Sequence, residues 1–422
     1  MRHRYSVIAS LAAASAALLV AACSSSSANS SGSASSPAAG ATAGAGTVGT
    51  KAPLLLGVDG GWSGPTSESA LPELAGVKAW AAWVNAQGGI DGHPIQLIVE
   101  DDQGSPARGL ANVEDLVQNK HVIALVGVHA NSTEPTWASY VESRHIPVVG
   151  GEEDTALWVT NPDFFLSAEP GLGVIATEAY VAKLAGGGFA TVNLAGVQDV
   201  GSLIQAFQAA AAKDGVAYRF HTTVSAASPN YTAACVAAEQ SGAKVVGLQL
   251  DPNTGGRVSA ACYAQGYKPT YLVPSGAYAP EMLGQPQFSG TYVPSPNFLW
   301  FASTPVAAQF SAAMAKYQPG AQLGPNSTAG WAAGLLFQAA AAHIGANPTS
   351  QDILNGLYAL PANDTLGGAS PGATFSRGKP AVPSGCFFLA QIQGGKLTAT
   401  GRRPGLPGCL MRADHNKEPE KP

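Results

Sequence analysis

Charged side chains are scarce in this chain of 422 residues, because Asp, Glu, Lys and Arg together make up 12% of it and hydrophobic residues 46%. The formal net charge is −5, so the chain lacks the basic surplus with which a protein neutralises nucleic-acid phosphates. No Cys-x-x-Cys spacing occurs, which removes a common signature of a zinc site. We therefore expect an extensive buried core and no bound nucleic acid, metal or cofactor.

The longest apolar run lies near the N-terminus. Arg2 and Arg4 precede an uncharged apolar stretch at residues 7–20, and small residues lead from there to Cys23. A membrane-spanning helix needs about 20 apolar residues, so this pattern predicts a cleaved signal peptide over residues 1–22. The residues before Cys23 resemble a bacterial lipobox, which implies lipid on that cysteine and an extracytoplasmic protein anchored to the bacterial cell membrane. The alternative is an ordinary secretory signal in which Cys23 is incidental.

A segment without charge or apolar periodicity follows the cysteine. Residues 24–50 are mostly Ser, Ala and Gly, a composition that cannot bury a core and behaves as a flexible coil. We expect the lipidated cysteine and a flexible tether over residues 23–52, and a disordered polar tail over residues 412–422. Removal of the signal peptide takes away two arginines and no acid, which lowers the formal net charge from −5 to −7.

Four cysteines remain once Cys23 is assigned to the lipid. An even number of cysteines in an exported protein predicts disulfide bonds, and four cysteines allow three connectivities. Proximity along the chain favours Cys235 with Cys262 and Cys386 with Cys409.

Short apolar runs alternate with helical periodicity from residue 54 onward, and the alternation restarts after residue 170. This repetition predicts an α/β fold with parallel sheets covered on both faces. The expected strands are residues 54–58, 95–100, 122–126, 147–149, 191–197, 218–224, 245–250 and 270–274, followed by a hairpin that begins with 386–393. The expected helices are residues 73–87, 106–119, 134–144, 173–185, 201–214, 231–241, 255–265, 306–317, 327–343 and 350–359.

The restart near residue 170 predicts two Rossmann-like lobes joined by a hinge. Each half is able to make its own sheet, and a body of this length exceeds what one core usually serves. We assign residues 53–170 and about 301–360 to lobe 1, and residues 171–300 and about 361–411 to lobe 2.

Two motifs suggest an enzyme or a cofactor but lack the required context. Residues 171–176 fit G-x-G-x-x-A ahead of a helix, yet Pro170 is incompatible with the tight strand-to-helix turn of a dinucleotide site. Residues 152–154 are three adjacent acids, whereas a glycosidase needs two acids that face each other across a cleft. We therefore expect no enzymatic activity.

Polar and small residues gather just after the predicted strands, at the edge where open α/β sheets bind ligands. Two lobes that face each other across a hinge would bring these loops into one cleft. For His129 an ordinary loop position is the alternative. The candidate ligand-binding residues are Trp62, Ser63, His129, Ala130, Asn131, Ser132, Gly151, Glu152 and Glu153 in the first half, and Gln198, Asp199, Asp251, Asn253, Ser275 and Tyr278 in the second.

Five short motifs follow one another in a defined order and spacing. They are Ser63-Gly64-Pro65, Val84-Asn85-Ala86-Gln87-Gly88-Gly89-Ile90-Asp91-Gly92, Asp101-Asp102, Ser132-Thr133-Glu134-Pro135 and Ile146-Pro147-Val148-Val149. Together they resemble the solute-binding proteins of ABC importers of the branched-chain amino acid type, the Leu/Ile/Val-binding proteins. The resemblance is strongest over residues 54–170. It implies the type 1 periplasmic-binding fold and a monomer that delivers a small-molecule ligand to an ABC permease in the membrane.

The ligand positions of that family carry over only in part. Its amino-acid binders hold the ligand with serine, alanine and threonine, whereas the corresponding places here look like Ala130-Asn131 and residues 151–153. Glu152 or Glu153 would repel a carboxylate in a low-dielectric cleft and attract an amine, so we expect a cationic or neutral polar ligand. Glu152 alternatively caps a helix that begins near Thr155, a role that we expect for Asp154.

The sequence thus predicts an extracytoplasmic binding lipoprotein that delivers a small polar molecule, such as an amino acid, amine or amide, to an ABC importer. One alternative is a ligand-sensing receptor subunit without transport. Another is a surface hydrolase that uses Glu152 or Glu153, which is disfavoured because no facing second acid is evident.

Overall fold

The structure is a computed structural model that describes residues 50–64, 66–195, 200–403, 406–407 and 409–411. The predicted signal peptide, Cys23, nearly all of the tether and the predicted tail lie outside the described residues, as do Gln198 and Asp199. Within the described part, every helix is too short or too polar to cross a membrane.

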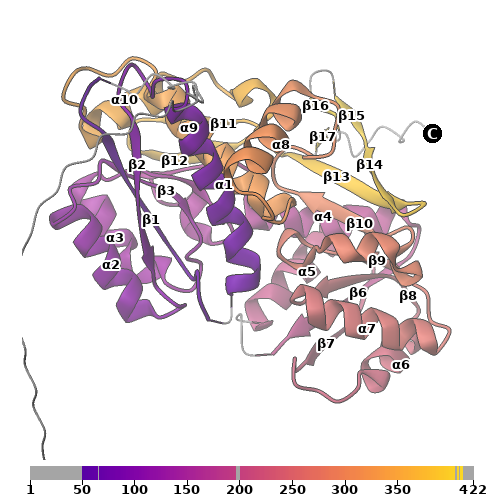
Figure 1. The fold of residues 1–422 in the computed structure, drawn as a ribbon. Helices are drawn as coiled ribbons and strands as arrows, with labels where there is room; N and C mark the ends of the chain where they lie inside the picture. The colour runs from indigo at the N-terminus through magenta and orange to yellow at the C-terminus, as the bar shows by residue number, and fades with distance from the viewer. Residues whose placement is uncertain (1–49, 65, 196–199, 404–405, 408, 412–422) are drawn as a thin grey trace, which may run out of the picture. The chain divides into compact units, whose positions relative to one another are not determined.

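The first sheet consists of five parallel strands in the order β2-β1-β3-β4-β5. The strand β1 is mostly apolar, apart from the buried Asp59, and is buried almost throughout, which is typical of a strand with helices on both faces of its sheet. Figure 1 shows α2 and α3 on one face and α1 on the other. The elements are β1 (Leu54–Gly60), α1 (Ser67–Asn85), β2 (Ile95–Asp101), α2 (Pro106–Gln118), β3 (Ala124–Val128), α3 (Glu134–Arg144), β4 (Val148–Gly151), the 3-10 turn η1 (Ala156–Val159) and β5 (Phe164–Phe165).

The second sheet has eight strands in the order β14-β13-β10-β9-β8-β6-β7, with β17 beside β13. Strands β6 to β10 run parallel, while β13 pairs antiparallel with β10, β14 and β17. The strands are β6 (Gly188–Leu194), β7 (Tyr218–Val224), β8 (Ala243–Gln249), β9 (Thr270–Leu272), β10 (Tyr292–Ser295), β13 (Cys386–Gln393), β14 (Lys396–Thr400) and β17 (Cys409–Met411). The predicted α/β fold with two lobes is confirmed.

Helices α4 and α5 pack against each other on the second sheet, as do α6 and α7. The chain then returns to the first sheet, where α9 packs along α1 and against β3 and β4. The helices are α4 (Gly171–Leu184), α5 (Val200–Asp214), α6 (Thr232–Gln240), α7 (Pro252–Ala264), α8 (Pro305–Tyr317), α9 (Pro325–Ala340) and α10 (Ser350–Ala359). The 3-10 turns are η2 (Ser275–Ala277), η3 (Pro280–Gly284), η4 (Pro286–Phe288) and η5 (Leu366–Gly368).

Two short strand pairs complete the fold: β11 (Ala373–Ser376) with β12 (Lys379–Pro383), and β15 (Arg402–Arg403) with β16 (Leu406–Pro407). The strand β12 contacts β5 and η1, and Ala373 and Ala381 join the buried residues around Trp137. The β11-β12 pair therefore packs with the first sheet, although its residues lie in the range that the sequence assigns to lobe 2.

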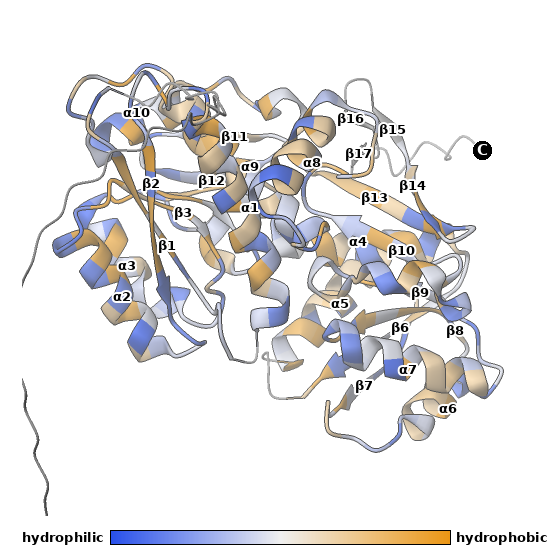
Figure 2. Ribbon diagram, viewed as in Figure 1, coloured by the Kyte–Doolittle hydropathy of each residue, from blue (hydrophilic) through white to orange (hydrophobic). Residues whose placement is uncertain are grey.

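Large apolar side chains fill both faces of the first sheet. Trp80 of α1 and Trp331 of α9 are fully buried on one face, and Trp137 packs against Phe164 on the other with ring centroids 5.8 Å apart. Figure 2 shows the strands of both sheets as mainly hydrophobic, whereas α2 and α3 mix hydrophobic and polar residues. The sheet edges that carry the loops are thus held on a rigid core.

Several predicted elements agree with the structure and others differ. The helix at 134–144 and the strand at 218–224 have the predicted bounds, and β13 with β14 forms the predicted hairpin. Helix α1 begins six residues before the predicted start, with Pro72 inside it. Pro72 has no N–H to donate to the backbone carbonyl of Glu68, four residues earlier. Glu68 is exposed in the first turn of the helix, so this missing hydrogen bond lies at the surface.

Candidate functional site

A buried histidine joins three elements at the carboxyl edge of the first sheet. His129 follows β3, and its Nδ1 lies 2.7 Å from Oε2 of Glu73 on α1. Its Nε2 lies 3.4 Å from Oε2 of Glu152, which follows β4, and 3.4 Å from Oγ of Ser69 on α1. We call His129, Glu73, Glu152, Asp154 and Asn131 the His129 cluster, because the charge of His129 also acts on Asp154, which is hydrogen-bonded to Asn131.

The acids of the His129 cluster differ in their access to solvent. The side chains of His129 and Glu73 are 3% and 2% exposed, whereas that of Glu152 is 26% exposed. Burial raises the pKa of Glu73 well above its ordinary value and also raises the pKa of Glu152, while the charge of His129 opposes the latter shift. Asp154 is exposed and already hydrogen-bonded to Asn131, so Glu152 is the solvent-accessible acid of the cluster with the weaker contact inside the protein.

A small cavity adjoins the cluster through Ser69. Its volume is about 10 Å³, the room of about one water molecule. The first part of α1 forms one wall with Glu68 and Ser69, and the loop after β9 forms another with Ser275 and Tyr278. Residues 322–326 before and at the start of α9 supply the rest of the polar lining, and the side-chain Nδ2 of Asn326 donates to the carbonyl of Ser69 at 2.7 Å. The cavity thus brings together the carboxyl edges of both sheets.

Trp62 and Ser63 make hydrogen bonds within the protein, to the end of β2. Trp62 is 8% exposed, its Nε1 donates to the carbonyl of Glu100 at 2.8 Å, and its ring centroid is 6.3 Å from that of His129. The hydroxyl of Ser63 donates to Oδ2 of Asp101 at 2.5 Å. These bonds tie the loop after β1 to the end of β2, and the ring of Trp62 is the part of this loop that lies near His129.

Glu153 turns away from Glu152. Its Oε1 accepts hydrogen bonds from the backbone N–H and the hydroxyl of Ser167, and its Oε2 accepts from the N–H of Ala168. Burial outweighs these donors and raises the pKa of Glu153 to about 8. Both carboxyl oxygens of Glu153 are therefore engaged within the protein rather than facing a solute.

The remaining candidates of the first half occupy different environments. Ala130 is buried, Ser132 is exposed, and Asn131 is half-buried beside Asp154. Gly151 has φ of 147°, and a Cβ there would lie 2.2 Å from the carbonyl oxygen of Val128. Glycine at this position lets β4 end against β3, which directs the next residue, Glu152, toward His129.

The expected helix near Thr155 is only the four-residue turn η1, and no side chain caps it. The hydroxyl of Thr155 donates instead to Oε2 of Glu134 at 2.7 Å. The capping role expected for Asp154 is therefore wrong, since the carboxyl group of Asp154 interacts with Asn131 and with the charge of His129. Glu152 forms no cap either, so the structure favours its interaction with His129.

In the second half the structure places Ser275 and Tyr278 on the cavity. Tyr278 is 4% exposed, and its ring packs against Trp300 with centroids 5.2 Å apart. Asp251 caps α7 by accepting from the N–H of Thr254 at 2.8 Å, and Asn253 is exposed. Gln198 and Asp199 lie outside the described residues.

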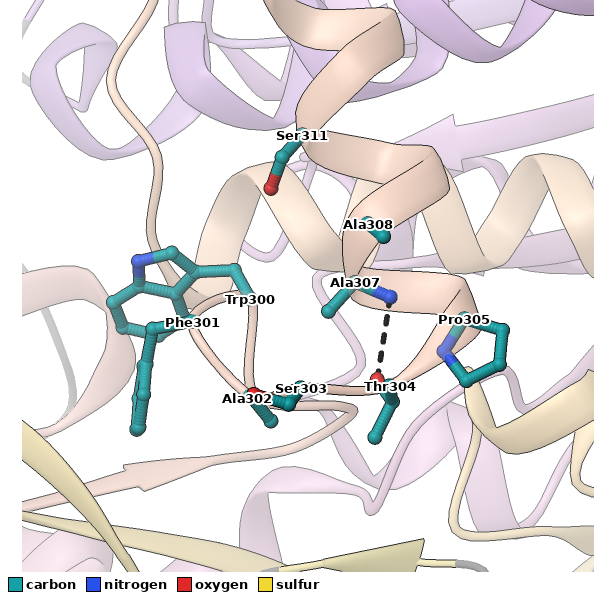
Figure 3. A pocket seen from close by; sticks show the side chains of 9 residues that line it. All are labelled: Trp300, Phe301, Ala302, Ser303, Thr304, Pro305, Ala307, Ala308 and Ser311. Atoms are coloured by element: carbon teal, nitrogen blue, oxygen red, sulfur yellow. Dashed lines mark hydrogen bonds between the residues drawn. The ribbon is translucent and has the colours of Figure 1, made fainter.

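A second pocket, of about 630 Å³, lies beside the start of α8 (Figure 3). Trp300 and Phe301 form one side, and Pro305 and Ala308 lie on the other. The hydroxyl of Thr304 caps α8 by accepting from the N–H of Ala307 at 3.3 Å. No charged side chain lines this pocket in the described part of the chain, and none of the predicted site residues belongs to it.

One further pattern is typical of hydrolases. Residues 368–372 read Gly-Ala-Ser-Pro-Gly and so match G-x-S-x-G. They begin at the last residue of η5 rather than at the end of a strand, and Ser370 is 2% exposed with its hydroxyl accepting from the N–H of Gly372. A nucleophilic serine of this type sits on a strand-to-helix turn with an exposed hydroxyl, so this context does not support a nucleophile.

Three described cysteines take part in disulfide bonds. Cys235 on α6 and Cys262 on α7 form a disulfide, the pairing that chain proximity favours. Cys386 is disulfide-bonded too, but the side chain of Cys409 lies outside the described residues, so that pairing stays a prediction. Among the residues that the structure describes, no three His, Cys, Asp or Glu side chains are placed to hold a metal ion.

A family model described as periplasmic binding protein matches residues 54–396. The chain belongs to the periplasmic binding protein family. The resemblance carried by the sequence motifs is thereby confirmed. No curated protein sequence matches the chain.

Solved structures of other periplasmic binding proteins share the fold. A branched-chain amino acid ABC transporter protein from Thermus thermophilus with bound valine has a TM-score of 0.72 at 17% identity, covering 88% of this chain and 99% of that one. A fatty acid ABC transporter substrate-binding protein from Thermomonospora curvata has a TM-score of 0.71 at 15% identity, covering 88% and 96%. A solute-binding protein from R. palustris in complex with 4-hydroxybenzoate has a TM-score of 0.67 at 15% identity, covering 85% and 97%.

Sequence reasoning missed four polar residues of this periplasmic binding protein's cavity. Glu68 and Ser69 lie in the first turn of α1, which the sequence places in a loop, and Gln322 and Asn326 lie next to the start of α9. The signal for the first pair is their position just after the Ser63-Gly64-Pro65 motif. The second pair has no such signal, because it comes to lie beside α1 only when the chain returns to the first sheet.

The first prediction concerns pH and stability. Burial raises the pKa of Glu178, on α4, from 4.5 to about 8, against hydrogen bonds from Gln249. The folded state binds this proton more tightly than the unfolded state, so the stabilisation is fully present below about pH 4.5 and is lost as pH rises through 8. We expect Glu178→Gln to be clearly more stable than the wild type at pH 8.5 and about equal to it at pH 4.

Chemical denaturation at the two pH values tests this expectation. The matched control is Glu239→Gln on α6, where the acid is exposed. A Glu178→Gln variant with the same pH profile as the wild type would contradict the assignment of a proton to Glu178 in the folded state.

Proposed function

We propose that the protein is the solute-binding component of an ABC importer and captures a small polar solute between its two lobes. The observation that carries this proposal is the cavity, whose lining comes from α1 and the start of α9 on one side and from the loops after β8 and β9 on the other. Membership of the periplasmic binding protein family supports it. So do the similar structures, which come from ABC transporters and include complexes with valine and 4-hydroxybenzoate.

In this proposal the lobes separate to admit the solute and close on it. A cavity of about 10 Å³ holds about one water molecule, so a solute enters only if the walls move apart. The linking segments lie side by side, because the N–H of Glu169 donates to the carbonyl of Pro296 and that of Phe298 to the carbonyl of Ala369. Contacts from both walls make the ligand favour the closed form.

We also propose the lobe assignment and the location that the sequence suggests. Lobe 1 contains residues 53–170 and about 301–360, and lobe 2 contains residues 171–300 and about 361–411, with the β11-β12 pair packed on lobe 1. Export through a signal peptide at residues 1–22 and a lipid on Cys23 would hold a monomer near its permease. The family description supports an extracytoplasmic location.

A thermal-shift screen of the purified protein tests the binding function. A solute at 100 times its Kd adds about 2.7 kcal/mol of stability and is expected to raise the Tm by about 3–5 °C. Mass spectrometry should then recover the solute unchanged, since the proposal includes no chemistry. Conversion of the solute would favour an enzyme, and the absence of a shift across amino acids, amines, amides, sugars and carboxylates would contradict solute capture.

A further inference from the structure

The His129 cluster contains more hydrogen-bond acceptors than donors. His129 supplies at most two N–H groups, one facing Glu73 and one facing Glu152. The hydroxyl of Ser69 is not an extra donor, because it donates to the carbonyl of Thr66 at 2.9 Å. The 3.4 Å between His129 Nε2 and Glu152 Oε2 is longer than an ordinary hydrogen bond, so the carboxyl group of Glu152 is weakly satisfied.

Two buried oxygen atoms of the cluster have no hydrogen-bond partner in the described part of the chain. One is Oε1 of Glu73, a residue that is 1% exposed, and the other is Oδ1 of Asn131. The charge of Glu73 also acts on Glu152, whose side chain is half-buried. Unpaired buried acceptors are costly, and a donor from a bound molecule would relieve that cost.

Acidic residues from the two halves of the chain also act on one another electrostatically near the cavity. Glu68, on the α1 wall, is exposed, and the charges of Asp251 and Glu281 from the second half raise its pKa after desolvation, the largest cause. None of the described residues that line the cavity is Lys, Arg or His. Like charges brought together by closure oppose it, and a positive charge between them favours it.

We infer that the ligand is a small organic cation that carries several N–H donors, such as a primary ammonium or a guanidinium group. Its charged end binds between Ser69 and Glu152, where it donates to the free carboxylate oxygen of Glu152. Its remaining N–H groups face the unpaired acceptors of the His129 cluster. This inference rests on the proposed solute-binding function and names the class of solute.

The acids and the unpaired acceptors of the site disfavour two other classes of ligand, carboxylates and quaternary ammonium ions. A carboxylate such as valine or 4-hydroxybenzoate brings negative charge to a cavity that Glu68 lines, that no basic residue lines among the described residues, and that adjoins the His129 cluster with Glu152 through Ser69. A quaternary ammonium ion brings positive charge but no N–H donor, so it leaves the acceptors of Glu73 and Asn131 unpaired. The expected ligand therefore carries both a positive charge and N–H donors.

Isothermal titration calorimetry with matched solutes of two to six carbons tests the inference. The panel contains alkyl ammonium and alkyl guanidinium ions, trimethylammonium ions, neutral amides and carboxylates. We expect the N–H cations to bind at least 30-fold more tightly than any other class. Tighter binding of an amide, a trimethylammonium ion or a carboxylate overturns the inference and leaves the proposed function standing. Binding by no class overturns both.

A substitution locates the site. Glu152→Gln keeps the shape of the side chain and removes its charge, and because that side chain is 26% exposed we expect the variant to fold. Its affinity for the N–H cations should fall at least 30-fold, with an unchanged circular dichroism spectrum. Glu114→Gln, a half-buried acid of α2, is the matched control and should change the affinity less than twofold. Unchanged affinity in Glu152→Gln would overturn the placement of the cation.

Discussion

Gly330→Ala is expected to destabilise the protein by about 3 kcal/mol, since overpacking a well-filled contact costs about 1–3 kcal/mol. A Cβ at Gly330 on α9 would lie 2.1 Å from the backbone carbonyl oxygen of Glu73 on α1. The contact is reciprocal, because a Cβ at Gly76 would lie 2.1 Å from the carbonyl oxygen of Ser327. The obstacles are helix backbones rather than flexible side chains, so one helix has to move and we expect the upper end of this range.

The matched control is Gly256→Ala on α7. A Cβ at Gly256 meets no described atom within 4 Å, and the glycine lies inside the helix. Alanine is favoured over glycine in a helix interior by about 1 kcal/mol, so this variant should be slightly more stable than the wild type. Chemical denaturation of both variants checks the opposite signs. A Gly330→Ala variant as stable as the wild type would show that α1 and α9 are not held this closely.

The Gly330→Ala variant should also lose ligand affinity. Helix α1 carries Glu73, which holds the ring of His129 at 2.7 Å, and Ser69, which lines the cavity. A shift of α1 away from α9 displaces both residues relative to Glu152, which follows β4. The affinity measured for the N–H cations should therefore fall in Gly330→Ala and stay unchanged in Gly256→Ala.

Local periodicity predicted the elements that pack on their nearest neighbours along the chain. The helix at 134–144 and the strand at 218–224 were predicted with their observed bounds, and Thr349 caps α10 as the predicted helix start implies. The strand β5 was missed because it contributes only two residues. The early start of α1 was missed because a proline inside a helix normally marks its boundary.

The candidate site was predicted in part, for a physical reason. Residues that end parallel strands share one edge of a sheet, which brought His129 and Glu152 together as expected. The opposite direction of Glu153 follows from the alternation of side chains along an extended chain, by which Glu152 and Asp154 face His129 and Glu153 faces Ser167. No local pattern indicates Glu73, because its contact with His129 spans 56 residues.

Removal of the disulfide between Cys235 and Cys262 is the second change that we expect to cause a large loss of stability. It closes a segment with a sequence separation of 27 residues, for which the loss of chain entropy in the unfolded state corresponds to about 3.5 kcal/mol. The double variant Cys235→Ala/Cys262→Ala should lose about this much stability in chemical denaturation. The double variant is preferable to a reducing agent, because Cys386 is also disulfide-bonded and reduction would act on both bonds.

Ligand affinity separates this effect from that of Gly330→Ala. Cys262 lies ten residues along α7 from Pro252, which lines the cavity, a distance of about 15 Å along the helix axis. The end of α7 at the cavity is held separately by the Asp251 cap. The double variant should therefore bind the same solute within about twofold of the wild type while it unfolds at lower denaturant. A loss of affinity as large as that of Gly330→Ala would mean that the disulfide holds the cavity wall itself.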